Sequence, residues 1–132
     1  MMIEVFSLAT IRERFGTGTP RRQFLYERLH AVVSRLYETG NVRHIYLFGS
    51  FPTEAPMPND VDLFVVMAAD FRTTGLTDVL LAVFTHDTCR IHYNADVFWV
   101  TESIGAEHIA DALTVFSRDR QFRTQPIVEV IP

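Results

Sequence analysis

The sequence contains no lysine. All 12 basic residues are arginine, against 16 aspartate and glutamate residues, so the 132-residue chain has a net charge of −4. The absence of lysine excludes Schiff-base chemistry, a lysine nucleophile and a phosphate-binding lysine of the Walker type. The acidic balance argues against nonspecific binding of nucleic acid, which requires a dense positive surface.

Cysteine and long apolar segments are also scarce. Cys89 is the single cysteine, so no intramolecular disulfide can form, and we expect a reducing, cytoplasmic compartment. The first residues have neither a basic segment nor a sustained apolar run, so we expect no signal peptide. The uncharged run 63–69 is far too short to cross a bilayer, and we expect no membrane partner.

What is present is an ordinary globular composition, 48% apolar and 21% charged, at a length typical of one domain. We expect a single domain over residues 1–132, with residues 1–18 as an N-terminal arm that carries the apolar run 3–8 and a short helical segment over 10–15. Gly16 and Gly18 follow no convincing strand and lack a third glycine, so we interpret them as a connector.

Helix and strand signals interleave along the rest of the chain, which predicts an α/β (α+β) fold with a short mixed sheet flanked by helices. The clearest helix has Thr19 as N-cap and Pro20 at its first position, and Gly40 closes it. Further helices are predicted over 76–86 and 106–116, and strands over 43–48, 60–67, 95–100 and 127–131. The loop 51–59 carries several prolines and cannot be regular throughout.

Carboxylates stand at the start of two buried strands. Asp60 and Asp62 are two residues apart, so in a strand they share a face, about 7 Å apart along the chain. Carboxylates this close repel one another unless a cation lies between them, and an all-oxygen site suits Mg²⁺. Asp96 opens the next buried strand and brings a third carboxylate to the same edge of the sheet. A two-metal site for phosphoryl or nucleotidyl transfer requires such a cluster.

A glycine and a serine follow the preceding strand. Gly49 would let a phosphate approach the backbone closely, and the Ser50 hydroxyl with neighbouring N–H groups would donate hydrogen bonds to it. This pair therefore predicts a phosphate-binding turn beside the carboxylates.

Together these segments resemble the nucleotidyltransferases of the DNA polymerase beta superfamily, and among them the minimal, stand-alone bacterial proteins. The resemblance runs from about residue 10 to the end, through RRQFLYERLHAVVSRL, YLFGSFPTEAPMPNDVDLFVVM, NADVFWV and the final IVEVI. Its specificity lies in the combination of Gly49, Ser50, Asp60 and Asp62.

The resemblance implies a role for each of these residues. Asp60 and Asp62 would hold two Mg²⁺ ions that bridge an NTP triphosphate, and Asp96 would complete the metal site and help to deprotonate the acceptor. Ser50 and the Gly49 backbone would contact the β and γ phosphates. The implied reaction transfers a nucleoside monophosphate, AMP first among the candidates, to a hydroxyl group. Stand-alone members resemble antitoxins that modify a partner HEPN toxin, so a partner protein is the expected acceptor.

The sequence also departs from the family pattern. Many minimal members continue after Gly-Ser with a small residue, an arginine and a glycine that begin a helix, whereas this chain has Phe51-Pro52-Thr53-Glu54. We also expect no helical substrate domain, which favours a protein as the acceptor. The missing arginine and the proline-rich loop favour the alternative function of a catalytically degenerate binding module that acts through a protein partner or as a homo-oligomer.

Other residues allow competing interpretations. His86, Cys89 and His92 are spaced as soft Zn²⁺ ligands, but an ordinary buried cysteine at a helix end is the favoured reading. Arg21 and Arg22 fit a solvated helix face better than a phosphate contact.

The remaining candidates are arginines and aromatic residues. No pattern selects one triphosphate partner among Arg43, Arg72 and Arg90. Phe98 and Trp99 are explained by core packing or an interface before base stacking.

Overall fold

A five-stranded mixed β-sheet forms the centre of the molecule. The computed structural model describes residues 2–132 and has the strand order β1-β5-β2-β3-β4. The two outer pairs, β1 with β5 and β3 with β4, are parallel, whereas β2 is antiparallel to both β5 and β3. The strands are β1 (Ile3–Ser7), β2 (Val42–Phe48), β3 (Val61–Met67), β4 (Ala95–Thr101) and β5 (Ile127–Ile131).

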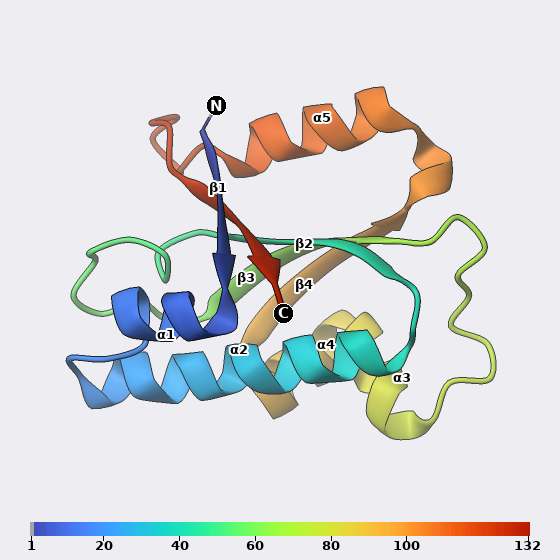
Figure 1. Ribbon diagram of the computed structural model, residues 1–132, viewed down its shortest axis with the longest axis horizontal. Coiled ribbons are helices and arrows are strands. Elements are labelled where there is room, and N and C mark those ends of the chain that lie inside the picture. The colour runs from blue at the N-terminus through green and yellow to red at the C-terminus, as the bar shows by residue number, and fades with distance from the viewer. Residues whose placement is uncertain (1) are drawn as a thin grey trace.

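Helices cover both faces of this sheet. Figure 1 shows α1 to α4 on one side and α5 on the other. Together with the mixed sheet, this arrangement confirms the expected α+β class. The helices are α1 (Leu8–Phe15), α2 (Pro20–Glu38), α3 (Asp78–Phe84), α4 (His86–Tyr93) and α5 (Ala106–Phe116), and a 3₁₀ turn, η1 (Glu102–Ile104), follows β4.

The predicted boundaries of α2 follow from its capping residues. The Thr19 hydroxyl accepts a hydrogen bond from the Arg22 N–H at 3.2 Å, Pro20 occupies the first turn, and Gly40 takes a φ of 69° after the helix ends. Inside the helix, Leu25 and Leu29 are fully buried against the sheet. Burial of each such side chain contributes roughly 1.5–3 kcal/mol, so tertiary packing fixes this helix.

Alternation along the strands divides the core into two layers. On β3, Leu63 and Val65 pack toward α2, whereas Phe64 packs toward α5 with Tyr46 and Leu113. Because side chains alternate along a strand, Asp62 shares the α5 face with Phe64. The Asp62 carboxylate therefore lies on the α5 side of the sheet, next to the core layer that contains Tyr46, Phe64 and Leu113.

The structure corrects two of the expected elements. Residues 1–18, expected to form an arm, contribute the edge strand β1, which pairs in parallel with β5, and helix α1; Met1 lies outside the described residues. The prediction of one helix over 76–86 is wrong at its end. α3 ends at Phe84, because Thr85 is extended (φ −111°, ψ 119°). Thr85 then precedes α4, a helix that no sequence pattern indicated.

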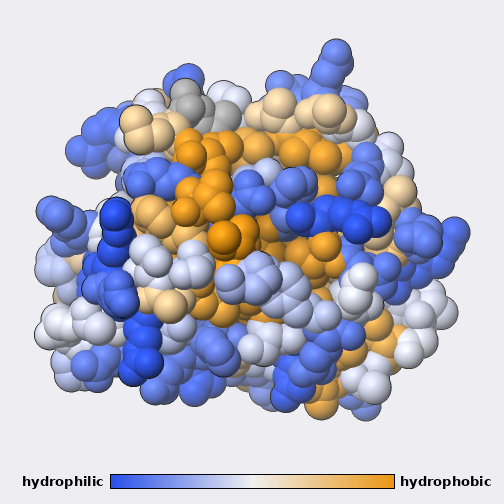
Figure 2. All heavy atoms as spheres, viewed as in Figure 1, coloured by the Kyte–Doolittle hydropathy of each residue, from blue (hydrophilic) through white to orange (hydrophobic). Residues whose placement is uncertain are grey.

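An exposed apolar strip lies along β1 and β5. Ile3, Val5 and Ile131 are 37%, 55% and 41% exposed, and Figure 2 shows apolar side chains gathered over these strands. α5 covers the β2 and β3 part of this face instead, through contacts with Tyr46 and Phe64. Within residues 2–132, no helix has both the length and the apolar character needed to span a membrane.

Candidate metal and phosphate site

The sheet register places two of the predicted carboxylates side by side. In the parallel pair of β3 and β4, Asp62 lies opposite Asp96, and on its other side Asp62 lies opposite Phe48 of β2. Asp60 immediately precedes β3. One ligand oxygen from each of Asp60, Asp62 and Asp96 can be chosen so that all three lie within 4.8 Å of one another. The structure thus brings together the three carboxylates selected from the sequence.

This cluster carries more negative charge than its surroundings neutralise. Burial, followed by the charges of Asp60 and Asp96, raises the pKa of the Asp62 carboxyl to about 7. Oδ1 of Asp96 is buried and has no hydrogen-bond partner. A bound cation would relieve both features, the buried acceptor without a donor and the carboxyl whose ionised form is disfavoured. The donor set, all oxygen and all anionic, fits Mg²⁺.

An arginine from α4 partly balances the cluster. Arg90 Nη1 lies 2.6 Å from Asp96 Oδ2 and 3.4 Å from Asp60 Oδ2. His86 Nε2 is 3.6 Å from Asp96 Oδ1, beyond hydrogen-bond distance. Hydrogen bonding to Asp96, together with its charge, raises the pKa of Arg90, so the guanidinium stays protonated. Of the three candidate arginines Arg43, Arg72 and Arg90, it is Arg90 that contacts this site.

The turn after β2 packs tightly against Asp62. Gly49 has a φ of 80°, a conformation that residues with a side chain rarely adopt. A Cβ added at Gly49 would meet Asp62 Oδ2 far inside van der Waals contact. Ser50 then begins a turn in which its carbonyl accepts from Thr53 N–H at 3.2 Å and from the Thr53 hydroxyl at 2.6 Å. Gly49 therefore allows the backbone to reach the carboxylate.

Replacement of Gly49 by alanine is expected to damage this site. The positive φ alone is expected to cost about 1–2 kcal/mol of folding free energy, and the new methyl group pushes Asp62 away from Asp60 and Asp96. We expect Mn²⁺ affinity, measured by electron paramagnetic resonance, to fall at least about tenfold. Gly75→Ala is the matched control, because Gly75 has a φ of 84° and open space around its added Cβ. Equal Mn²⁺ affinity in both variants would contradict the prediction.

The loop between the glycine turn and the carboxylates is held by two arginines of α2. Arg22 is only 9% exposed and donates to the carbonyls of Phe51 at 2.8 Å and Thr53 at 2.7 Å. It also bonds the carbonyls of Ala55 and Phe15. Arg21 donates to the Pro58 carbonyl at 2.9 Å and to that of Asn59. The solvated-face interpretation of Arg21 and Arg22 is therefore wrong, because both side chains are committed to backbone carbonyls.

A cleft of about 540 Å³ opens above the carboxylates. The segment after α5 contributes Arg118 and Arg120 to its lining. Asp119 orders this segment by accepting from the N–H groups of Gln121 at 2.8 Å and Arg123 at 2.9 Å. The cleft is lined by Phe48, Gly49, Ser50, Asn59, Asp60, Asp62, Asp96, Phe98, Phe116, Arg118, Asp119, Arg120 and Gln125.

No sequence motif points to Arg118 and Arg120 as part of this cleft. Arg118 and Arg120 sit in the polar stretch SRDRQFR, whose clustered arginines were the available signal. Their distance in sequence from Gly49 concealed the proximity, which arises because β5 returns next to β2. Basic and acidic groups consequently line one cleft.

Aromatic rings form an apolar wall of the cleft. Phe116 lies with its ring centroid 4.4 Å from that of Phe48 and 5.3 Å from that of Phe98. Phe98 is 42% exposed, whereas Trp99 packs between Phe71 and Phe84 and donates to the Phe84 carbonyl at 3.2 Å. Core packing thus explains Trp99, and Phe98 keeps an accessible ring at the site.

The predicted Zn²⁺ ligands form no metal site of their own in the described part of the chain, and the other two candidate arginines lie elsewhere. Cys89 is fully buried and burial raises its thiol pKa to about 12, while His86 and His92 are exposed. Among residues 2–132, the aspartate cluster is the one group of three or more such side chains that could hold a metal, which agrees with reading Cys89 as an ordinary buried cysteine. Arg43 pairs with Glu102 at 3.4 Å, and Arg72 follows the opposite end of β3.

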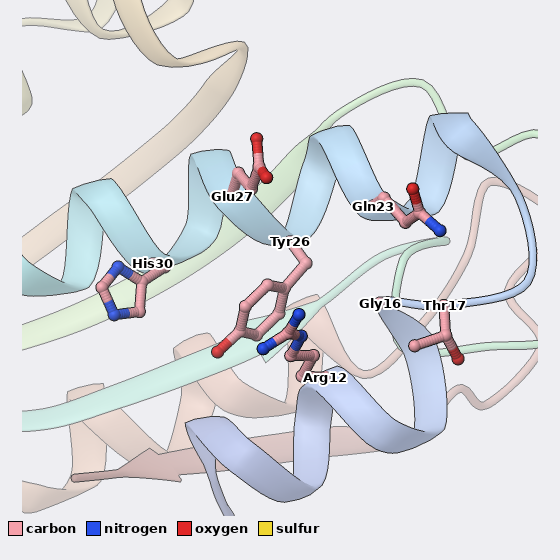
Figure 3. A pocket seen from close by; sticks show the side chains of 7 residues that line it. All are labelled: Arg12, Gly16, Thr17, Gln23, Tyr26, Glu27 and His30. Carbon is pink, nitrogen blue, oxygen red and sulfur yellow. The ribbon is translucent and has the colours of Figure 1, made fainter.

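A second cavity, of about 520 Å³, lies between α1 and α2 (Figure 3). Arg12 lies over the ring of Tyr26, 5.9 Å from its centroid. A Cβ added at Gly16 would be 2.8 Å from Tyr26 Cβ, so this glycine permits close approach to α2. Gly16 thus serves helix packing, and Gly16 and Gly18 both lie in the connection between α1 and α2, in agreement with their interpretation as a connector.

Comparison with known proteins identifies a family but no activity. No curated protein and no solved structure matches this chain significantly. The model of one family of unknown function, DUF6932, matches residues 3–131. This protein belongs to the DUF6932 family.

Proposed function

We propose that this protein has the nucleotidyltransferase fold and transfers a nucleoside monophosphate, AMP first among the candidates, from an NTP to a hydroxyl group with Mg²⁺. The observation that carries the proposal is the carboxylate cluster of Asp60, Asp62 and Asp96, within 4.8 Å and beside the Gly49-Ser50 turn. A cytoplasmic location with a pool of NTP is part of the proposal.

The metal is proposed because the cluster needs positive charge. Asp96 Oδ1 is buried without a donor, and Asp62 holds its proton unusually well. Asp60, Asp62 and Asp96 would hold two Mg²⁺ ions, which supply the positive charge that offsets the triphosphate. The chain has no lysine to replace that charge.

The chain's own residues supply the remaining contacts. Gly49 and Ser50 line the cleft, and their N–H groups and the Ser50 hydroxyl would donate to phosphate oxygens. Arg118 and Arg120, which line the same cleft, would pair with the terminal phosphates. The exposed ring of Phe98 offers a surface on which the base can stack.

The proposed nucleotidyl transfer forms one bond at the α-phosphorus and breaks another. The acceptor oxygen forms a bond to the α-phosphorus, the bond from that phosphorus to the bridging oxygen breaks, and pyrophosphate leaves. Oδ1 of Asp96, which has no hydrogen-bond partner, is the atom proposed to take the acceptor's proton. The acceptor is proposed to be a hydroxyl on a partner protein, with a HEPN-like toxin as the first candidate from the family resemblance.

The direct test incubates the protein with Mg²⁺, candidate partner proteins and NTPs labelled at either the α or the γ phosphate. We expect the α label, and not the γ label, to become covalently attached to the partner, with a matching mass increase of one nucleotide. EDTA and Asp60→Asn are each expected to remove the labelling by about 10³-fold or more. Asp111→Asn, an exposed change on α5, is the matched control and should label normally. Attachment of the γ label instead would overturn the proposal.

One observation favours the second candidate, a catalytically degenerate binding module. No helix follows Ser50, because the next residues form turns whose carbonyls bond to Arg22. The phosphate-binding end of a helix is thus absent from this side of the cleft. This candidate predicts that Asp60→Asn combined with Asp62→Asn leaves partner binding unchanged, which titration calorimetry can measure.

A further inference from the structure

We propose that Arg90 is a built-in counter-ion that occupies the metal position and moves to the phosphates when metal and nucleotide bind. The inference rests on the proposed function and adds a control of ligand binding to it. Arg90 Nη1 touches Asp96 at 2.6 Å and Asp60 at 3.4 Å, so its guanidinium lies between these two carboxylates. A divalent cation that binds both carboxylates requires the same space.

The backbone of Arg90 is held by neighbouring contacts, whereas its side chain is half exposed. The neighbouring Cys89 is fully buried, and the Arg90 carbonyl accepts from Asn94 N–H at 3.0 Å at the end of α4. Asn94 in turn donates through its amide to the Asn59 carbonyl at 2.8 Å. The Arg90 side chain, by contrast, is 47% exposed and makes its side-chain bonds only to Asp60 and Asp96 among the described residues. A rotation about its side-chain bonds therefore releases the carboxylates without moving α4.

In the metal-free cluster, Arg90 pairs with Asp60 and Asp96 but not with Asp62. A metal ion that binds Asp60 and Asp96 must therefore displace the guanidinium.

Coupling between ligands follows from this competition. A bare cation must break the Arg90 pairs with no new partner for the guanidinium, which lowers its affinity. A nucleotide bound in the same cleft provides phosphate oxygens, with which an arginine forms strong charge-assisted bonds. Metal and nucleotide therefore bind more tightly together than separately, and each raises the affinity for the other by the same factor.

The test titrates the intact protein with Mn²⁺ alone and measures free Mn²⁺ by electron paramagnetic resonance. Arg90→Gln is expected to bind Mn²⁺ about tenfold more tightly than the natural protein, because the competing cation is gone. In excess Mg²⁺, the same variant should bind a non-hydrolysable ATP analogue about tenfold more weakly. Arg43→Gln, which removes an exposed pair with Glu102, is the matched control and should change neither affinity.

The outcomes separate this inference from the proposed function. Equal Mn²⁺ affinity in the natural protein and in folded Arg90→Gln would overturn the counter-ion role and leave the metal site intact. Absence of Mn²⁺ binding in both proteins, with and without the ATP analogue, would overturn the proposed function together with the inference. Arg90→Lys keeps the charge and should bind Mn²⁺ more weakly than Arg90→Gln. Circular dichroism verifies that each variant is folded.

Discussion

Asp62→Asn is expected to stabilise the metal-free protein at pH 8 while it removes Mn²⁺ binding and nucleotidyl transfer. The Asp62 carboxyl has a pKa of about 7 in the folded protein, against 3.8 as its ordinary value, because it is buried beside Asp60 and Asp96. The folded state therefore binds this proton more tightly than the unfolded state does. Its contribution to stability is complete below pH 3.8 and is lost as the pH rises through 7.

Asparagine never ionises, so the variant should retain that contribution at high pH. We expect the free energy of unfolding in EDTA to rise by about 2 kcal/mol at pH 8 and to change little near pH 4. Urea unfolding at the two pH values measures both quantities. Mn²⁺ binding is expected to fall below detection, and transfer by about 10³-fold, because one metal ligand is lost.

The prediction for Asp62→Asn has a control substitution and a result that would contradict it. Asp111→Asn on the exposed face of α5 should leave the pH dependence of stability unchanged. If Asp62→Asn instead destabilises the protein at pH 8, the ionised carboxylate has a favourable partner in the fold, and the cluster does not require a cation. The prediction therefore tests the electrostatic basis of the metal site without any knowledge of the acceptor.

Local patterns were sufficient for the half of the site that lies on consecutive strands. β2, β3 and β4 are neighbours in both sequence and space. The Gly49-Ser50 turn, Asp62 and Asp96 therefore meet at one edge, as the strand signals and carboxylate positions indicated. The exact register of Asp62 with Asp96 came only from the structure.

The other half of the site, with Arg118 and Arg120, depends on pairing between strands that are distant in the sequence. β1 pairs with β5 from the other end of the chain, and β5 inserts next to β2. A short apolar run such as 3–7 does not reveal its partner, so it was expected to be part of an arm. The same return of the chain brings Arg118 and Arg120 to the cleft.

Arginine contacts were hidden for a related reason. Arg22 and Arg90 occur in helices, where a charged residue ordinarily faces solvent. Their real partners are backbone carbonyls of the 51–55 loop and carboxylates before and within strands. Such partners depend on how the helices are placed, and neither helix periodicity nor composition carries that information.

Arg22→Met is expected to lower the free energy of unfolding by about 3 kcal/mol. The buried guanidinium donates to the carbonyls of Phe51, Thr53, Ala55 and Phe15, and burial lowers the pKa of Arg22, as expected for a charge with poor access to water. Methionine fills similar space but leaves these carbonyls without their donor. Urea unfolding at pH 7 measures the loss.

The same substitution is expected to loosen the loop that joins the Gly49-Ser50 turn to Asp60. Phe51 keeps its ring in the core, with its centroid 6.4 Å from that of Phe15, but the backbone from Thr53 to Ala55 loses its anchor. Limited proteolysis should cleave this segment faster, and binding of an ATP analogue should weaken. Arg21→Met, which removes contacts to Pro58 and Asn59 from a less buried side chain, should cost about 1 kcal/mol or less. Equal losses in the two variants would show that Arg22 contributes no more than an ordinary surface contact.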